Sequence, residues 1–118
     1  MKNIREIKFY KSYFTEFYLS CTEKEQLKIQ YVLKVIETQQ IVPVKFFKQI
    51  EGSPGLYEIR VEYQGNIFRI FCCNDEGAIV VLFNGFHKKT QKTPPDEIQR
   101  AERIMNDYFN DKANGKIN

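Results

Sequence analysis

Residues 57–83 restrict the fold more than any other part of the chain. The apolar residues at the start of this segment alternate with charged ones, which is the period of a strand with one apolar face: Tyr57, Ile59, Val61 and Tyr63. Gln64-Gly65 predicts a tight turn into a second strand over 66–73. Asp75-Glu76-Gly77 predicts another turn into a third strand over 78–83, which is apolar on both faces, as in a central strand.

The length of the first turn decides which side chains meet across the hairpin. A two-residue loop at 64–65 pairs Val61 with Phe68 and Arg60 with Arg69. The apolar side chains then share one face of the hairpin, whereas a three-residue loop mixes polar and apolar side chains on both faces. We therefore predict the two-residue register, in which the charged residues share the other face: Glu58, Arg60, Glu62 and Arg69.

Two arginines directly opposite each other repel unless an anion lies beside them. One interpretation is that Glu58 and Glu62 supply the negative charge and form a salt-bridge ladder with Arg60 and Arg69. The other is an anion site, because the planar guanidinium group binds phosphate in a bidentate manner. The pattern alone leaves both interpretations open.

The other segments predict three helices and one more strand. Thr22 and Glu25 have the spacing of a capping box, and the apolar stripe after them predicts a helix over 22–40. A shorter helix is predicted around 14–21 and a short strand over 4–10, while 41–55 reads as irregular. Thr93 as N-cap, followed by proline, predicts a last helix, with a frayed tail over 110–118. We expect one α+β domain over 1–118, a small antiparallel or mixed sheet of about four strands with two N-terminal-half helices packed on one face and a C-terminal helix.

Composition narrows the class of protein. A chain of 118 residues with 42% apolar and 28% charged residues is typical of one ordinary globular domain. No run approaches the roughly 18 apolar residues of a membrane span, and the first residues lack a signal-peptide core, so we expect a cytosolic protein. Three cysteines and one histidine have no metal-ligand spacing. We therefore expect buried reduced thiols, no metal and no cofactor.

Residues 87–92 form the most basic stretch, with three lysines and no acid. The net charge of +3 says little about nucleic acid by itself, and a solvated loop is the plain interpretation of such a run. His87 titrates near neutral pH and is one candidate for acid–base chemistry. If strict alternation continues along the strand from Phe83, His87 shares the face of Phe83 and Lys88 points the other way.

Several short motifs occur together in this order. They are Gly-Leu-Tyr-Glu-Ile-Arg at 55–60, Phe-Arg-Ile at 68–70, Phe-x-Lys-Lys-Thr-x-Lys-Thr-Pro at 86–94, and Ala101. With them the chain resembles, over almost its whole length, the phage-derived HigB branch of the RelE toxin superfamily. The resemblance implies the RelE fold and the toxin role of a type II toxin–antitoxin system. Such toxins enter the ribosomal decoding site and cut messenger RNA, and an antitoxin, usually a helix-turn-helix protein in this branch, holds them inactive.

Carried over residue by residue, the resemblance makes Arg60 and Arg69 the phosphate-binding arginines and Lys88 and Lys89 the basic pair after the final strand. It does not make His87 catalytic, since that position varies in the family. Three further lysines are candidates for RNA contact: Lys45, Lys48 and Lys92.

The residues suit a metal-independent cleavage in which the RNA 2′-hydroxyl attacks the adjacent phosphate. That reaction needs cations on the phosphate, a base at the 2′-oxygen and an acid at the leaving 5′-oxygen. A lysine crowded by other cations has a lowered pKa, so Lys88, Lys89 or His87 could serve as the acid or base. Two alternatives stay open: a toxin of the same fold that inhibits DNA gyrase by binding, and a non-catalytic module that holds RNA or an acidic partner.

Overall fold

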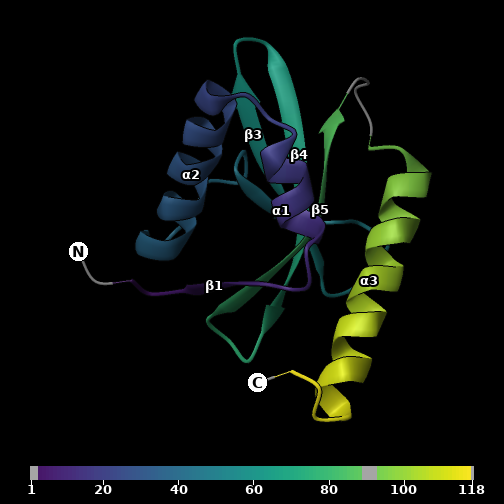
Figure 1. The fold of residues 1–118 in the computed structure, drawn as a ribbon. Coiled ribbons are helices and arrows are strands. Elements are labelled where there is room, and N and C mark those ends of the chain that lie inside the picture. Colours follow the sequence, from purple (N-terminus) through teal and green to yellow (C-terminus); the bar gives the residue numbers. More distant parts are fainter. Residues whose placement is uncertain (1–2, 89–92, 118) are drawn as a thin grey trace.

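A computed structural model describes residues 3–88 and 93–117. Figure 1 shows its elements in chain order: β1 (Glu6–Phe9), α1 (Tyr13–Leu19), α2 (Glu23–Thr38), β2 (Phe47–Gln49), β3 (Leu56–Tyr63), β4 (Asn66–Asp75), β5 (Ile79–Lys88) and α3 (Pro95–Ala113). The strands form one sheet in the order β1-β5-β4-β3-β2, in which the β1–β5 pair is parallel and the others are antiparallel. This α+β architecture confirms the predicted fold class, with one more strand than expected. The additional strand is β2, which pairs with β3 inside the segment that we expected to be irregular.

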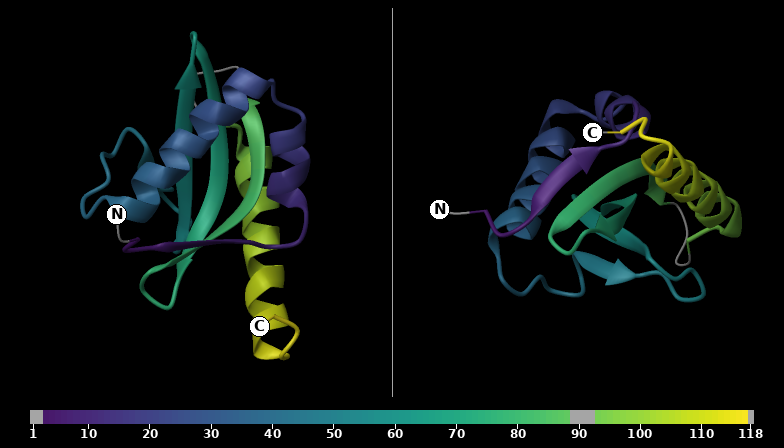
Figure 2. Two further views of the ribbon diagram at one scale, coloured as in Figure 1. Left: turned by 60° about the vertical axis from the view of Figure 1, so that its left-hand side comes forward. Right: turned by 90° about the horizontal axis from the view of Figure 1, so that it is seen from below.

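Helices cover both faces of the sheet (Figure 2): α1 and α2 pack on one face, as predicted for the two N-terminal-half helices, and α3 packs on the other. One buried cluster lies between the sheet and helices α1 and α2, with Ile29, Val32 and Ile36 packed on strand residues such as Ile70. A second cluster lies under α3, with Ala101, Ile104 and Tyr108 packed on the opposite face. The sheet therefore needs apolar side chains on both faces, and its polar residues on the α3 side stand out as exceptions.

The β3–β4 hairpin has the predicted register. Arg60 pairs with Arg69, Val61 with Phe68 and Tyr63 with Asn66. The two turn residues both have positive φ, 51° for Gln64 and 82° for Gly65, which is the backbone of a tight hairpin turn. Near the turn, the apolar residues Ile59, Val61, Phe68 and Ile70 lie on the α1–α2 side. The arginines lie on the α3 side, as do Leu56 and Phe71 farther along the same strands.

Strand β5 contains a β-bulge that changes the direction of its last side chains. Cys72 pairs with Leu82, but Ile70 pairs with Gly85, so β5 has one more residue than β4 between these two pairs. The bulge shifts the alternation by one residue. His87 consequently pairs with Phe68 on the α1–α2 side, while Lys88 pairs with Ile67 on the side of Arg69. His87 and Lys88 face opposite ways as predicted, but His87 does not share the α3-facing side with Phe83.

The helix termini confirm one capping prediction and correct another. The Thr22–Glu25 capping box is present at the start of α2. Helix α3 begins after Pro94 without a side-chain cap, because the Thr93 hydroxyl donates a hydrogen bond to Glu58 instead. The same helix continues to Ala113, past residue 110 where we expected the tail to begin, and near its end Asp111 accepts a hydrogen bond from Tyr10.

The remaining expectations from composition concern cysteines and membrane spans. Cys72 and Cys73 are buried free thiols and Cys21 is a half-buried one, and burial raises the pKa of all three. Along the described ranges, none of the helices is both long enough and apolar enough to cross a membrane.

Candidate nucleic-acid site

Arg69 forms a buried ion pair with Glu58 on the α3 side of the sheet. Arg69 is 6% exposed and Glu58 is 2% exposed, and 3.4 Å separates Arg69 Nε from Glu58 Oε1. This contact is an ion pair without a hydrogen bond, since Arg69 Nε has no hydrogen-bond partner among the described residues. Burial lowers the pKa of Arg69, Glu58 raises it and Arg60 lowers it further, but an arginine stays protonated at neutral pH. Arg69 is therefore a buried cation whose Nε is paired with Glu58 by charge and not by a hydrogen bond.

A groove of about 560 Å³ opens beside this pair, between β2, the end of β5 and the start of α3. We call it the basic groove and define it by Lys48, Glu58, Lys88 and Thr93, which line it, with Arg69 in contact with Glu58. Thr93 Oγ1 donates a 2.8 Å hydrogen bond to Glu58 Oε1. This explains why the threonine is absent from the helix cap.

Lys88 is the half-buried cation of the basic groove. Its pKa is lowered by burial first and then by the charge of Arg69, while Glu58 opposes the shift and Lys48 and Arg60 add to it. A lysine with a lowered pKa loses its proton more easily than a surface lysine does. The groove thus combines cations suited to phosphate with an amine suited to proton transfer.

Arg60 lies at the edge of this region rather than inside the basic groove. Its side chain is 29% exposed, and its guanidinium group forms a 3.0 Å ion pair with Glu62 Oε1. Arg60 lines a separate hollow of about 280 Å³ with Lys28 and Lys45. Lys48 lines the basic groove together with Lys88, and Lys45 lines the separate hollow together with Arg60, so these two of the predicted RNA-contacting lysines lie near predicted site cations.

His87 lies on the other face of the sheet. Its ring stacks on Phe68, with 4.9 Å between ring centroids, and the side chain is exposed. It lines a cleft with residues of α1 and not the basic groove. The structure does not bring His87 together with Arg69 and Lys88, and the β5 bulge is the physical reason. Lys89 and Lys92 lie outside the described residues.

Two side chains of the groove differ in part from what the sequence predicts. Glu58 pairs with Arg69, as one interpretation of the hairpin predicts, but the burial of its carboxylate was not predicted. Thr93 was predicted to cap the helix, but its hydroxyl donates a hydrogen bond to that carboxylate. The feature that could have indicated the burial of Glu58 is its position on a strand that lies between β2 and β4. That position can be interpreted only once the order of the strands in the sheet is known.

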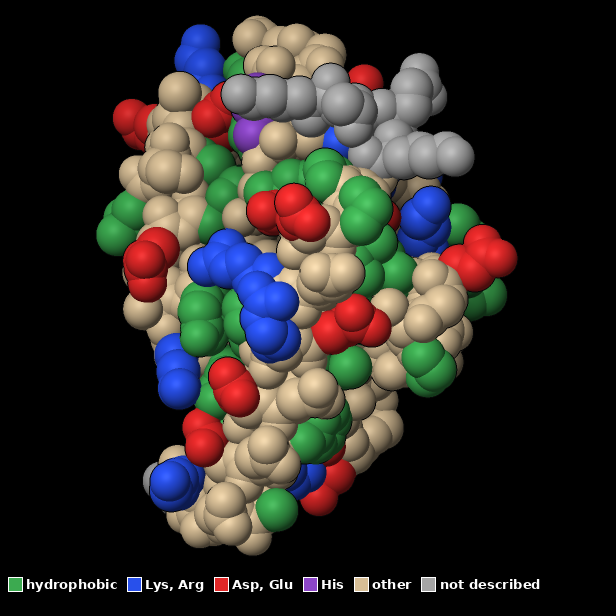
Figure 3. Space-filling view, turned by 90° about the vertical axis from the view of Figure 1, so that its right-hand side faces the viewer, with side chains coloured by type: hydrophobic (Ala, Val, Ile, Leu, Met, Phe, Trp, Pro, Cys, Tyr) green, Lys and Arg blue, Asp and Glu red, His purple; other side chains and the backbone are tan. Residues whose placement is uncertain are grey.

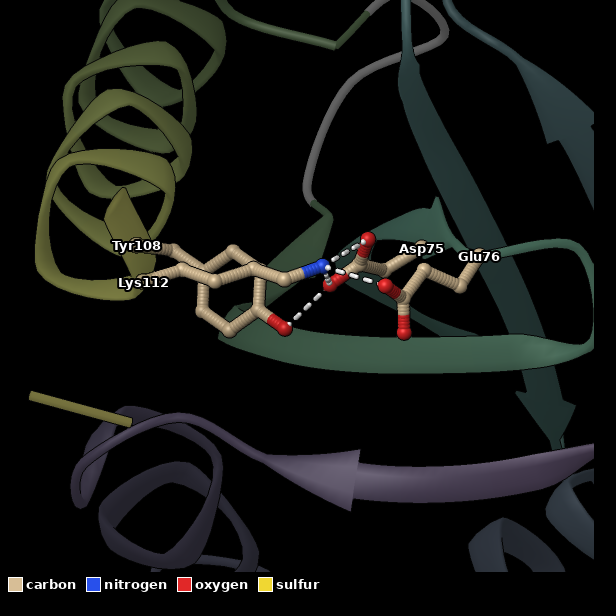
Figure 4. A network of polar contacts seen from close by, with 4 residues as sticks. All are labelled: Asp75, Glu76, Tyr108 and Lys112. Carbon is tan, nitrogen blue, oxygen red and sulfur yellow. Dashed lines mark hydrogen bonds and ion pairs between the residues drawn. The ribbon is translucent and has the colours of Figure 1, made fainter. Parts of the chain in front are cut away.

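A second ionic cluster lies at the other end of the α3 side, and Figure 4 shows its four residues. In this Asp75 cluster, Lys112 Nζ lies 2.8 and 2.9 Å from the two carboxylate oxygens of Asp75, and Tyr108 Oη donates to the same carboxylate at 2.5 Å. Glu76 adds a 3.4 Å ion pair to Lys112. Burial alone would raise the pKa of Asp75, but the hydrogen bonds from Lys112 and Tyr108 outweigh it and hold the pKa below its ordinary value.

Comparison with solved structures defines the class of fold. The chain is similar to a chain of the archaeal RelE–RelB complex from Pyrococcus horikoshii OT3, with a TM-score of 0.55 at 12% sequence identity. The similarity covers 73% of this chain and 97% of the other. At this identity the likeness concerns the fold, which is RelE-like.

The sequence gives the family. Residues 16–106 match the family described as "Phage derived protein Gp49-like (DUF891)", and the chain belongs to that family. A comparison with curated proteins gave no match. The RelE-like fold that the resemblance implied is therefore confirmed, whereas membership of the RelE toxin superfamily and of its HigB branch remains a prediction.

Proposed function

We propose that this protein is the toxin of a type II toxin–antitoxin system, of the HigB branch, and that it cuts messenger RNA on the ribosome. The observation that carries the proposal is the placement of Lys88 and Arg69 on the same face of the sheet at a groove of about 560 Å³. Among the described residues, three cations in or beside this groove, Lys48, Arg69 and Lys88, outnumber its carboxylates, Glu51 and Glu58. A phosphate of single-stranded RNA would complete the charge balance.

The chemistry assigned to the groove is attack of an RNA 2′-hydroxyl on the adjacent phosphorus. The 2′-oxygen loses its proton to a base and forms a bond to phosphorus, and the bond from phosphorus to the 5′-oxygen breaks while an acid protonates that oxygen. The products are a 2′,3′-cyclic phosphate and a 5′-hydroxyl. Arg69, assisted by Arg60, stabilises the charge that develops on the phosphate, and Lys88 transfers a proton.

The site favours RNA cleavage over gyrase inhibition. A protein that only binds gyrase needs no cation held in a fixed position by a buried carboxylate, nor a half-buried lysine whose pKa is lowered next to it. These features are typical of sites that stabilise a transition state.

A non-catalytic RNA-binding module is the second candidate, and one observation favours it. Arg60 and Arg69 both have carboxylate partners, Glu62 and Glu58, as the salt-bridge interpretation of the hairpin requires. In that case the basic groove holds RNA without cutting it. Cleavage is the property that separates the two candidates.

The proposal includes partners and a location. The target is messenger RNA in the ribosomal decoding site, and the inhibitor is a HigA-like antitoxin with a helix-turn-helix domain. Both place the protein in the cytoplasm. A small open reading frame with a helix-turn-helix pattern next to this gene would support the pairing.

The test is to map transcript ends after brief induction of the protein in cells. We expect new 5′ ends inside translated reading frames and none in untranslated RNA. Intact messages during growth arrest would contradict the nuclease proposal, and cuts in untranslated RNA would contradict its dependence on the ribosome.

Arg69→Ala is the matched loss-of-function variant. Removing one preorganised donor from a transition state lowers the rate by about 10²–10³-fold, and we expect cleavage to fall by that amount. Arg103→Ala is the control, since Arg103 is an exposed arginine of α3 outside the groove. Because Arg69→Ala leaves Glu58 buried without its partner, circular dichroism and antitoxin binding must show that the variant is folded.

A further inference from the structure

Two lysines beside the edge of β3 have no carboxylate partner in the described part of the chain. Lys28 lies in α2 and Lys45 lies before β2, and neither forms an ion pair with a described residue. Lys28 Nζ instead lies 5.1 Å from the centroid of the Tyr31 ring. Lys45 Nζ lies 5.0 Å from the centroid of the Phe46 ring. These cation–π contacts restrict the two ammonium groups without neutralising their charge.

Arg60 lines a hollow of about 280 Å³ together with these two lysines. We call it the Lys28 hollow and define it by the residues of its wall: Lys28, Lys45, Phe46, Arg60 and Glu62. Strand β2 pairs with β3 only as far as residue 59, and the Arg60 N–H then donates a 2.9 Å hydrogen bond to the Phe46 carbonyl. Beyond that bond, no strand of the described chain pairs with this edge of β3. Side chains from α2 and from the sheet therefore reach the same hollow.

The charges of the Lys28 hollow favour an anion. Among the described residues that line it, three cations face one carboxylate, and that carboxylate, Glu62, is paired with Arg60 at 3.0 Å. The Glu62 side chain is 51% exposed, and an ion pair in such a position is weak, so it does not prevent Arg60 from binding a further anion. On the α3 side, by contrast, Figure 3 shows basic side chains in the middle of the face with acidic ones around them. The lining of the hollow thus carries an excess of positive charge.

We propose that the Lys28 hollow binds a backbone phosphate of a single-stranded nucleic acid. Lysine and arginine are the side chains that neutralise backbone phosphates, and arginine does so in a bidentate manner. Arg60 pairs with Arg69 across neighbouring strands, which lie about 5 Å apart, so the hollow adjoins the region of the basic groove. An RNA with one phosphate in the basic groove then places a nearby phosphate in the hollow, where Lys28 and Lys45 anchor the strand and take no part in bond breaking. This last step rests on the proposed function, whereas binding of a phosphate in the hollow does not.

The test measures the binding of a short oligothymidylate at a series of salt concentrations. This probe has no 2′-hydroxyl, so binding is measured without cleavage. For the variant that combines Lys28→Gln with Lys45→Gln, we expect affinity to fall about 5-fold at moderate ionic strength. The slope of log affinity against log salt concentration should become shallower by about 0.7, the contribution of one phosphate contact on a single strand.

The control variant combines Lys24→Gln with Lys34→Gln. It removes the same charge from exposed lysines of α2 that do not line the hollow. We expect its slope to equal that of wild type and its affinity to stay within about 2-fold, since long-range attraction is screened by salt. Replacing Lys28 and Lys45 by arginine keeps both charges and should restore binding. Circular dichroism shows whether each variant is folded.

The outcomes separate this proposal from the cleavage proposal. Wild-type affinity and slope after the two substitutions in the hollow, or an equal loss in the control variant, overturn the phosphate site even if messages are cut. NMR signals of the two ammonium groups that shift with inorganic phosphate but not with the oligonucleotide overturn the assignment to a nucleic acid. Loss of antitoxin binding alone also overturns it, because the hollow then receives an acidic protein. A loss of oligonucleotide binding that is specific to the hollow, in a protein that cuts no RNA, supports the phosphate site and contradicts the nuclease.

Discussion

The two ionic clusters on the α3 side of the sheet contain similar groups, but these groups are paired to different extents. Each has one buried carboxylate that accepts a hydrogen bond from a hydroxyl: Asp75 from Tyr108, and Glu58 from Thr93. Lys112 reaches both oxygens of Asp75 within 2.9 Å, whereas Arg69 stays 3.4 Å from Glu58 and forms no hydrogen bond to it. The first cluster is satisfied internally, and the second has cations in excess.

This difference indicates what each cluster is for. The Asp75 cluster joins α3 to the end of β4, and its polar groups are paired with one another. Such a network stabilises the folded state and leaves few groups free to bind a ligand. A buried ion pair with further cations beside it contributes little net stability, because desolvation offsets the attraction. We therefore expect substitutions in the Asp75 cluster to change stability, and substitutions of Lys88 at the basic groove, which leave the buried Arg69–Glu58 pair intact, to change activity.

The largest effect is expected for Lys88→Arg. This variant keeps the positive charge, but it replaces an amine that has a lowered pKa with a guanidinium group, which does not titrate. If Lys88 transfers a proton, cleavage falls by about 10²-fold or more, the usual contribution of general acid–base catalysis. Lys112→Arg, the same change in the Asp75 cluster, should leave cleavage unaltered. Full activity of Lys88→Arg would reduce Lys88 to a phosphate-binding cation.

The next effect is on stability and concerns Asp75→Ala. The buried Tyr108 hydroxyl loses its acceptor, which costs about 2–3 kcal/mol of the free energy of unfolding. Urea unfolding measures this change, and cleavage by the folded fraction should equal that of wild type. Asp107→Ala is the control, since Asp107 is an exposed aspartate of helix α3. A loss of cleavage without a loss of stability would mean that the two clusters are not separate in function.

The same cluster predicts a dependence on pH. Because the folded-state pKa of Asp75 lies below its unfolded value, the carboxylate contributes stability that is complete above an unfolded pKa of about 3.9. That contribution is lost as the pH falls through the folded pKa. The stability gap between wild type and Asp75→Asn should be constant near neutral pH and close in acid, as urea unfolding at a series of pH values would show. A gap that persists at the lowest pH would show that packing, not charge, is responsible.

The smallest effect is expected at the exposed ion pair of Arg60. Glu62 is mostly in solvent, with a side chain 51% exposed, so Glu62→Ala should change the free energy of unfolding by less than about 1 kcal/mol. The same variant frees Arg60 for phosphate and should not reduce cleavage. A clear loss of stability would favour the salt-bridge interpretation of the hairpin and weaken the distinction between the two clusters.

The local sequence pattern was sufficient to predict several features of the fold. The period-two alternation and the Gln64-Gly65 turn determine the hairpin register, because a slip of one residue would move every apolar side chain to the wrong face. The pairing of Arg60 with Arg69 follows from that register. The capping box of α2 was predictable for a similar reason, since its two partners are three residues apart.

Only the tertiary structure decided which of the basic residues meet. Strict alternation along β5 would have put His87 on the α3 side and turned Lys88 away, but the bulge at Asn84 reverses both. Thr93 likewise leaves the cap for Glu58, a residue 35 positions away in the chain. The physical reason is the same in both cases. A bulge and a long-range hydrogen bond depend on neighbours from other strands and helices, and the local sequence contains no record of them.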